Sequence, residues 1–273
     1  MAFMTKDNLD WNVVSSPLFY TLPNGETREM GNRVVNLRDD NYAQLGIVSP
    51  TYEVFQNSSL KNLVAPMLSE GLITIENQGF LGKGSQVFIQ ARMAEEFRIV
   101  GENHVGMLTL MNSHDGGSNL SAGVTDTRIV CSNTFAQAMH DMSSKIKHDF
   151  RMAERALEIT ETINFVNEGM RKFSEAAEVL ATTKASESVV DQVIRAAYGK
   201  KENETVRSRD RIQQLFRYGK GNEGKTLWDA FNAVTEFVTH EGRKDPKAKF
   251  AYSNFGTGAA LSRRAMDAAL ALV

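Results

Sequence analysis

The sequence contains a single cysteine, Cys131, in 273 residues. One cysteine cannot form an intrachain disulfide, which agrees with a reducing compartment. No apolar run approaches the roughly 20 residues that a membrane-spanning helix needs, and the N-terminus lacks the basic and then apolar pattern of a secretory signal. We therefore expect a soluble protein of the cytoplasm that has no membrane partner.

A strong charge of one sign is also missing, because the formal net charge is −2. The balance is nevertheless uneven along the chain. Residues 1–140 carry nine basic against fourteen acidic side chains, whereas residues 195–225 carry nine against four. Phosphate groups respond to the local field of a surface and not to the charge of the whole chain. A nucleic-acid-binding surface would therefore have to be local.

No motif for metal binding or catalysis is present. The histidines do not form the i, i+4 pair with a glutamate that a zinc protease helix requires, so a metal site would need residues that are distant in the sequence. We predict no catalytic residue, no metal and no cofactor. The five histidines are His104, His114, His140, His148 and His240.

Two segments leave an enzymatic alternative open. His114 and Asp115 lie in a glycine-rich polar loop, and surface loops commonly carry such residues. In the enzymatic alternative they would act with Cys131 or Arg128. Cys131 lies between a predicted strand and a predicted helix cap, where a helix N-terminus lowers the pKa of a thiol. A lone cysteine is more often a small buried apolar residue.

The N-terminal half has the pattern of strands separated by turns. Pro23-Asn24-Gly25 predicts a hairpin between its flanking runs, residues 45–55 are extended, and residues 57–59 cap a helix over 60–71. Later β-type runs have connections too short for crossover helices, which predicts an antiparallel meander. These runs are residues 72–79, 86–92, 104–111 and 120–131.

The C-terminal half has helical periodicity. Ser132, Asn133 or Thr134 can cap a first helix, and apolar spacing predicts further ones over residues 151–183, 186–198, 226–239 and 257–272. The predicted fold is α+β, with an antiparallel β-meander packed with long helices and followed by a helical C-terminal half. We divide the chain into a strand-rich core, 1–140, and a helical region, 141–273, packed on the core or serving as an oligomerisation module.

Basic residues suggest where a nucleic acid would bind. Lys83 lies in a glycine-rich hairpin turn that lacks the spacing of a nucleotide triphosphate loop. Residues 195–225 interleave cations with Tyr198, Phe216 and Tyr218, a mixture that suits single-strand binding but also occurs on solvated helix faces. The predicted nucleic-acid-binding residues are Lys83, Arg92, Arg128, Lys145, Lys147, Arg151, Arg207, Arg209, Arg211 and Arg217.

Three parts of the chain carry a family resemblance: Asn36-Leu37-Arg38 with residues 45–52, residues 128–134, and residues 226–236 with 255–258. They resemble a family of phage- and plasmid-borne proteins of undefined function. The predicted meander followed by a long helix is similar to the core of phage single-strand-annealing proteins of the Red-beta type. That similarity implies a ring or filament of identical subunits that holds single strands without metal or nucleotide.

We therefore expect a single-stranded DNA-binding and annealing protein that acts in homologous recombination as a homo-oligomer, in the cytoplasm of a bacterial host cell. Its partners would be single-stranded DNA and other copies of itself. The alternative is a protein-interaction factor, such as an inhibitor of a host defence system, whose long helices are docking surfaces.

Overall fold

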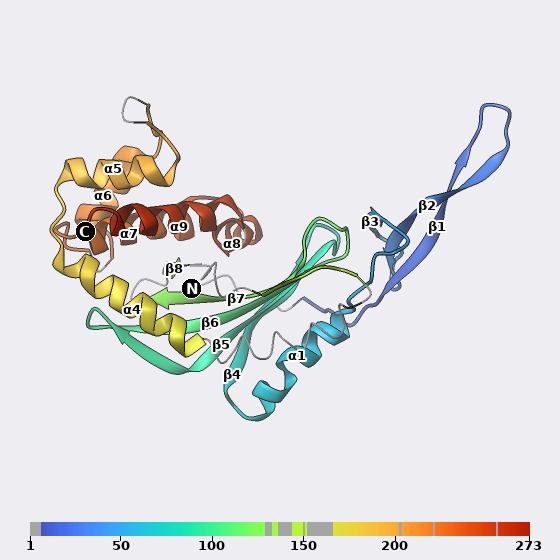
Figure 1. The fold of residues 1–273 in the computed structure, drawn as a ribbon, viewed down its shortest axis with the longest axis horizontal. Coiled ribbons are helices and arrows are strands. Elements are labelled where there is room, and N and C mark those ends of the chain that lie inside the picture. The colour runs from blue at the N-terminus through green and yellow to red at the C-terminus, as the bar shows by residue number, and fades with distance from the viewer. Residues whose placement is uncertain are drawn as a thin grey trace.

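The computed structural model describes residues 7–128, 133–135, 144–149, 151, 166–201, 204–220, 222–254 and 256–273. Antiparallel strands occupy the N-terminal half and helices the C-terminal half (Figure 1), which confirms the predicted α+β class. Within these residues, no helix combines the length and the apolar character needed to cross a bilayer.

The larger sheet is an antiparallel meander, as predicted. Its strands run in the order β4-β5-β6-β7-β8, and β9 also pairs with β7. Val100 and Gly101 both have positive φ, so a two-residue turn joins β5 to β6. The bounds are β4 (Ile73–Leu81), β5 (Gln86–Ile99), β6 (Glu102–Ser113), β7 (Leu120–Arg128), β8 (Asn133–Phe135) and β9 (Ser144–Ile146).

Successive side chains of a strand point to opposite faces of the sheet, and both faces of this sheet are covered. Val87, Ile89 and Ala91 of β5 belong to one core cluster with helix α1 (Asn57–Ser69). Phe88, between them, faces the other way and contacts Phe250 of the C-terminal half, with ring centroids 4.8 Å apart. The sheet is therefore a shared layer between α1 and the C-terminal helices.

The C-terminal helices form a second core that also includes Ile99 of β5. The ring of Trp228 contacts the rings of Phe173 and Phe231 in this core. Helix α4 contacts β5 and β7, which attaches this core to the sheet. The elements are α4 (Val166–Thr182), α5 (Glu187–Ala197), α6 (Arg209–Tyr218), α7 (Leu227–Glu236), the π-helical turn η2 (Phe237–Glu241), α8 (Pro246–Asn254) and α9 (Thr257–Leu270).

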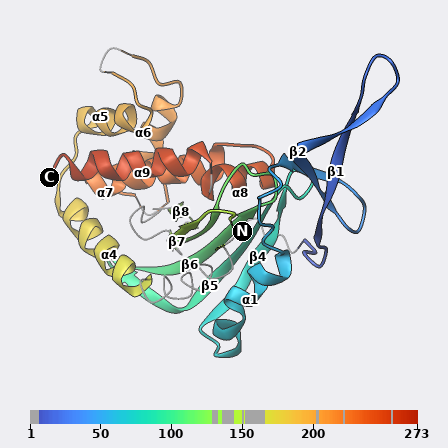
Figure 2. The same ribbon diagram turned by 45° about the vertical axis from the view of Figure 1, so that its right-hand side comes forward.

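A smaller sheet of β1 (Val13–Thr21), β2 (Thr27–Arg38) and β3 (Gln44–Val48) contains the predicted hairpin. We call residues 13–38 the arm. Its outer part stands away from the larger sheet and the helices in both views (Figure 1 and Figure 2), and every residue from Thr27 to Arg33 is exposed. The register shifts between Pro17 and Phe19, so an irregularity in the strand pairing separates the arm's base from its tip.

Several local predictions were wrong. Asn133 and Thr134 do not cap a helix but lie in β8, where they pair with residues of β7. Asn57 does not cap α1 either, because it is the first helical residue and its side chain bonds elsewhere. Helix α6 was not expected. Cys131, Ser132 and the boundary at residue 140 lie outside the described residues, and β9, beyond that boundary, pairs with β7.

Candidate nucleic-acid interface

The ten predicted cations do not form one surface. Strand register separates those of the sheet. Gln86 pairs with Ser113, and Leu120 pairs with Ile146, so the Lys83 turn, β9 and Lys147 lie at one end of the sheet. Arg128 pairs with His104 at the opposite end of β6. Ten residues along a strand span on the order of 30 Å, which is too far for one side chain to bridge.

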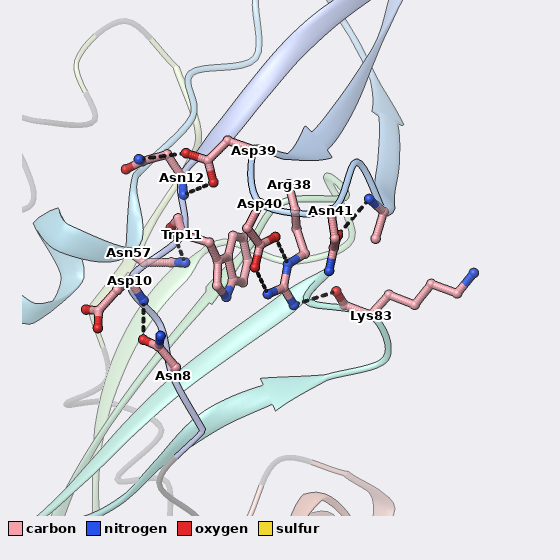
Figure 3. A network of polar contacts seen from close by, with 11 residues as sticks. Asn8, Asp10, Trp11, Asn12, Arg38, Asp39, Asp40, Asn41, Asn57 and Lys83 are labelled. Carbon is pink, nitrogen blue, oxygen red and sulfur yellow. Dashed lines mark hydrogen bonds and ion pairs between the residues drawn. The ribbon is translucent and has the colours of Figure 1, made fainter.

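Lys83 is accessible at the end of the sheet that also contains β9. It is exposed, and in Figure 3 its side chain extends away from the neighbouring polar groups. Its turn is held rather than loose, because the Lys83 carbonyl accepts a hydrogen bond from Arg38 at 3.4 Å. Lys147 and Arg151 are also exposed. The backbone of Lys145 pairs with Ser121 in β9.

Arg92, in the middle of β5, is committed to carboxylates. Its guanidinium lies 2.8 Å from Glu96 and 3.7 Å from Glu76. An exposed ion pair of this kind contributes up to about 1 kcal/mol, so a phosphate could displace it at modest cost. The pairing nevertheless lowers the positive field that Arg92 presents.

The arginines of α6 also have acidic partners. Arg211 makes a bidentate pair with Glu241 at 2.6 and 2.8 Å, and the hydrogen bond from Arg211 holds the pKa of Glu241 below its usual value. Arg217 pairs with Glu187, and Arg209 with Asp191. Arg207, before the helix, is exposed. The sequence count of +5 for this stretch therefore overstates its surface field.

The aromatic residues of the same stretch do not form a stacking platform. Phe216 is 2% exposed and belongs to the helical core, and the hydroxyl of Tyr198 accepts a hydrogen bond from Ser208 at 2.6 Å. Tyr218 is 82% exposed. Of the three rings that the sequence suggested, one is therefore presented to solvent.

One cavity does bring cations from separate segments together. It lies between α5 and α6 and has a volume of about 630 Å³. Burial alone would raise the pKa of Asp191 in its wall, but hydrogen bonds from Arg195 and Arg209 outweigh burial and lower it. Asp191 therefore stays ionised and fixes both guanidinium groups. The cavity is lined by Glu187, Ser188, Asp191, Gln192, Arg195, Ala196, Lys200, Arg209 and Gln213.

A polar network joins the arm to the larger sheet (Figure 3). We call it the arm–sheet junction: Trp11, Asn36, Arg38, Asn57 and His114. The Arg38 guanidinium pairs with Asp40 at 2.6 Å and lies over the Trp11 ring, 4.3 Å from its centroid. Asn57 donates to the Trp11 carbonyl at 3.0 Å, and Asn36 donates to the His114 carbonyl at 2.9 Å.

His114 is buried in this junction rather than exposed on a loop as predicted. It is 0% exposed, and its Nε2 lies 3.0 Å from the Asn57 side-chain oxygen. Because Asn57 uses its amide group as donor to Trp11, its oxygen accepts and Nε2 carries the proton. Burial, and then the neighbouring His148, lower the pKa of His114 to about 4, against the opposing effect of Asp115.

Among the described residues, the geometry gives no support to the enzymatic alternative, and Cys131, one of its candidates, lies outside them. Asp115 accepts hydrogen bonds from Ser113 at 2.6 Å and from the Gly117 backbone at 2.7 Å, which shapes its own turn. His114 cannot reach a substrate, and Arg128 lies at the other end of β6. In the described part of the chain, no three His, Cys, Asp or Glu residues are grouped for metal binding.

The residues that carried the family resemblance have structural roles where they are described. Asn36, Arg38 and Tyr52 fix the arm–sheet junction and its surroundings, Tyr52 by donating to the Ser113 carbonyl at 2.6 Å. Gly46 lies so close to Asp115 that a Cβ would overlap it. The motif signal was visible in the sequence, but its meaning as a junction required the positions of distant partners.

A family model described as a domain of unknown function (DUF932) covers residues 44–268. This range begins at the first residue of β3, so β1 and β2 precede it. No curated protein and no solved structure matches the chain.

Proposed function

The chain belongs to the DUF932 family, and we propose that it is a single-stranded DNA-binding and annealing protein that works as a homo-oligomer. The observation that supports this most is the order of elements: the β4–β7 meander is followed by the short strands β8 and β9 and later by α4, which packs on β5 and β7. That order resembles the core of the Red-beta type of annealing proteins. The proposal includes a phage or plasmid origin, a role in homologous recombination and a bacterial cytoplasmic location.

The mechanism is electrostatic capture of the phosphate backbone without a cofactor. Lys83, Lys147 and Arg151 would contact phosphates at one end of the sheet. One such group in each copy suits an oligomer in which a strand passes from one copy to the next. Bases that are not held by side chains stay available for pairing.

A salt series tests this proposal. With about five phosphate contacts per site, raising salt from about 50 to 200 mM is expected to weaken single-strand binding on the order of 100-fold. Mobility shift with single-stranded and double-stranded oligonucleotides measures this. Absence of salt-sensitive single-strand binding by the purified protein would overturn the proposal.

The arm supports self-assembly. A two-stranded ribbon is at best marginally stable by itself in water, yet the tip exposes Phe19 (60%), Tyr20 (42%) and Met30 (37%). We propose that a neighbouring copy covers this tip. In the alternative, in which the protein is an inhibitor of a host defence system, a host protein would cover the tip of the arm instead.

Replacing both Phe19 and Tyr20 by serine is expected to convert an assembled particle to monomers, because the apolar contact is lost. Mass measurement in solution shows the change. Tyr42→Ser is the matched control, since Tyr42 is 74% exposed but lies outside the arm. A monomeric unsubstituted protein would contradict self-assembly, and a stoichiometric host protein captured regardless of nuclease would favour the alternative.

A further inference from the structure

The α5–α6 cavity has features that general backbone capture does not require. Its three cations come from three places in the chain: Arg195 from α5, Lys200 from the following loop and Arg209 from the start of α6. In both views α5 and α6 lie at the end of the molecule opposite the arm (Figure 1 and Figure 2). The cavity is thus distinct from the cations of the Lys83 end.

The cations are fixed before any ligand arrives. Asp191 accepts from the Nε of Arg195 at 2.7 Å and also from the Nε of Arg209. Arg195 is held further by the backbone carbonyls of Lys201 and Glu204. A guanidinium has five N–H donors, and Asp191 uses only the Nε donor of each. Both guanidinium groups are therefore held in place before an anion binds, which reduces the entropic cost of binding, and Arg195 keeps its Nη2 donors because the two carbonyls use Nη1.

The size and charge of the cavity indicate which class of ligand it binds. A volume of about 630 Å³ is that of a small-molecule pocket and not of a groove that follows a strand. Two carboxylates, Glu187 and Asp191, belong to the lining, and a third, Glu204, pairs with Lys200 at 2.9 Å beside it. A phosphoryl group that bound here would take the place of the exposed Glu204 carboxylate at Lys200. A run of phosphodiesters would meet the carboxylates in the wall.

We propose that this cavity binds a phosphate monoester of a nucleotide. The inference rests on the proposed function for its biological source, the phosphorylated end of a DNA strand, but a free nucleotide presents the same group. A monoester carries about −1.5 to −2 at neutral pH, against −1 for an internal phosphodiester. Ser188, Gln192 and Gln213 supply the neutral hydrogen-bonding groups for a sugar or base edge.

The direct test compares 5′-phosphorylated, 3′-phosphorylated and unphosphorylated oligonucleotides of one sequence. We expect one phosphorylated form to bind about tenfold more tightly, as one charge-assisted contact would give, and Arg209→Gln to abolish that preference. Arg211→Gln is the matched control: it lies two residues along α6 but pairs with Glu241, outside the cavity. Lys200→Gln provides a second variant, with a side chain that is 43% exposed.

Calorimetry with a nucleoside monophosphate and with inorganic phosphate separates this inference from the proposed function. Binding by the unsubstituted protein that is lost in Arg209→Gln, with an unchanged melting temperature, would support the cavity even if no DNA bound. Equal affinity for all three oligonucleotides, together with no binding of either phosphate compound, would overturn it while leaving single-strand binding intact.

Discussion

Asp229→Ala is expected to lower the free energy of unfolding by about 3 kcal/mol, because the carboxylate organises the start of α7. Asp229 is 5% exposed. Its oxygens accept from the backbone nitrogens of Lys225 and Thr226, both at 3.0 Å, and from Glu223 at 3.3 Å. Together with Thr226 it forms a capping box, and α7 carries Trp228 and Phe231 into the helical core.

Denaturant titration and thermal melting measure this effect. The expected loss corresponds to a fall in melting temperature of about 6 to 12 °C. Asp229→Asn keeps one acceptor oxygen and should lose about half as much. Asp267→Ala, an exposed residue of α9, should change stability by no more than about 0.5 kcal/mol. Equal stability of the Asp229→Ala and Asp267→Ala proteins would contradict a role for this carboxylate.

Acidification is expected to destabilise the arm–sheet junction by roughly 3 kcal/mol through His114. The pKa of His114 falls from 6.5 to about 4 on folding, chiefly because burial disfavours the charged ring. The unfolded chain therefore binds more protons between these values. The stability contributed by neutral His114 is complete above pH 6.5, is lost progressively as the pH falls and stops changing below about pH 4.

The prediction is checked by comparing unfolding free energies of the unsubstituted protein and His114→Gln between pH 7 and 4. Glutamine can still donate to Asn57 but does not titrate, so its curve should be flatter across this window. Burial also lowers the pKa of His148, whose ring stacks on Tyr52 with centroids 4.5 Å apart. His148 thus adds a slope of the same sign to both proteins. Parallel curves would show that His114 does not carry the effect.

The larger sheet and the hairpin could be predicted because their signals are local. Pro23-Asn24-Gly25 specifies a tight turn, and Gly82 and Gly101, both with positive φ, lie in turns that break the meander's apolar runs. Connections of a few residues allow only antiparallel neighbours. The same reasoning failed at Asn133 and Thr134, where β8 pairs with β7, because a long-range backbone partner overrode a local cap signal.

The candidate interface could be predicted only as a set of charges. The sequence gives nine basic side chains in residues 195–225, but not that Glu241 and Asp191 bind Arg211 and Arg209. Nor does it indicate that Phe216 is buried while Tyr218 is exposed, although the two residues are close in sequence. Ion-pair partners of this kind lie up to 30 residues away, beyond the reach of local patterns.

The sequence by itself therefore determined the α+β class, the antiparallel meander and the absence of a recognisable catalytic motif, since period and turn chemistry act between neighbouring residues. Tertiary structure alone decided that Asn57 serves the Trp11 carbonyl instead of capping α1, that His114 is buried, and that Arg195, Lys200 and Arg209 surround one cavity. Desolvation and ion pairing depend on which groups that are distant in the sequence come into contact, and only the folded chain determines those contacts.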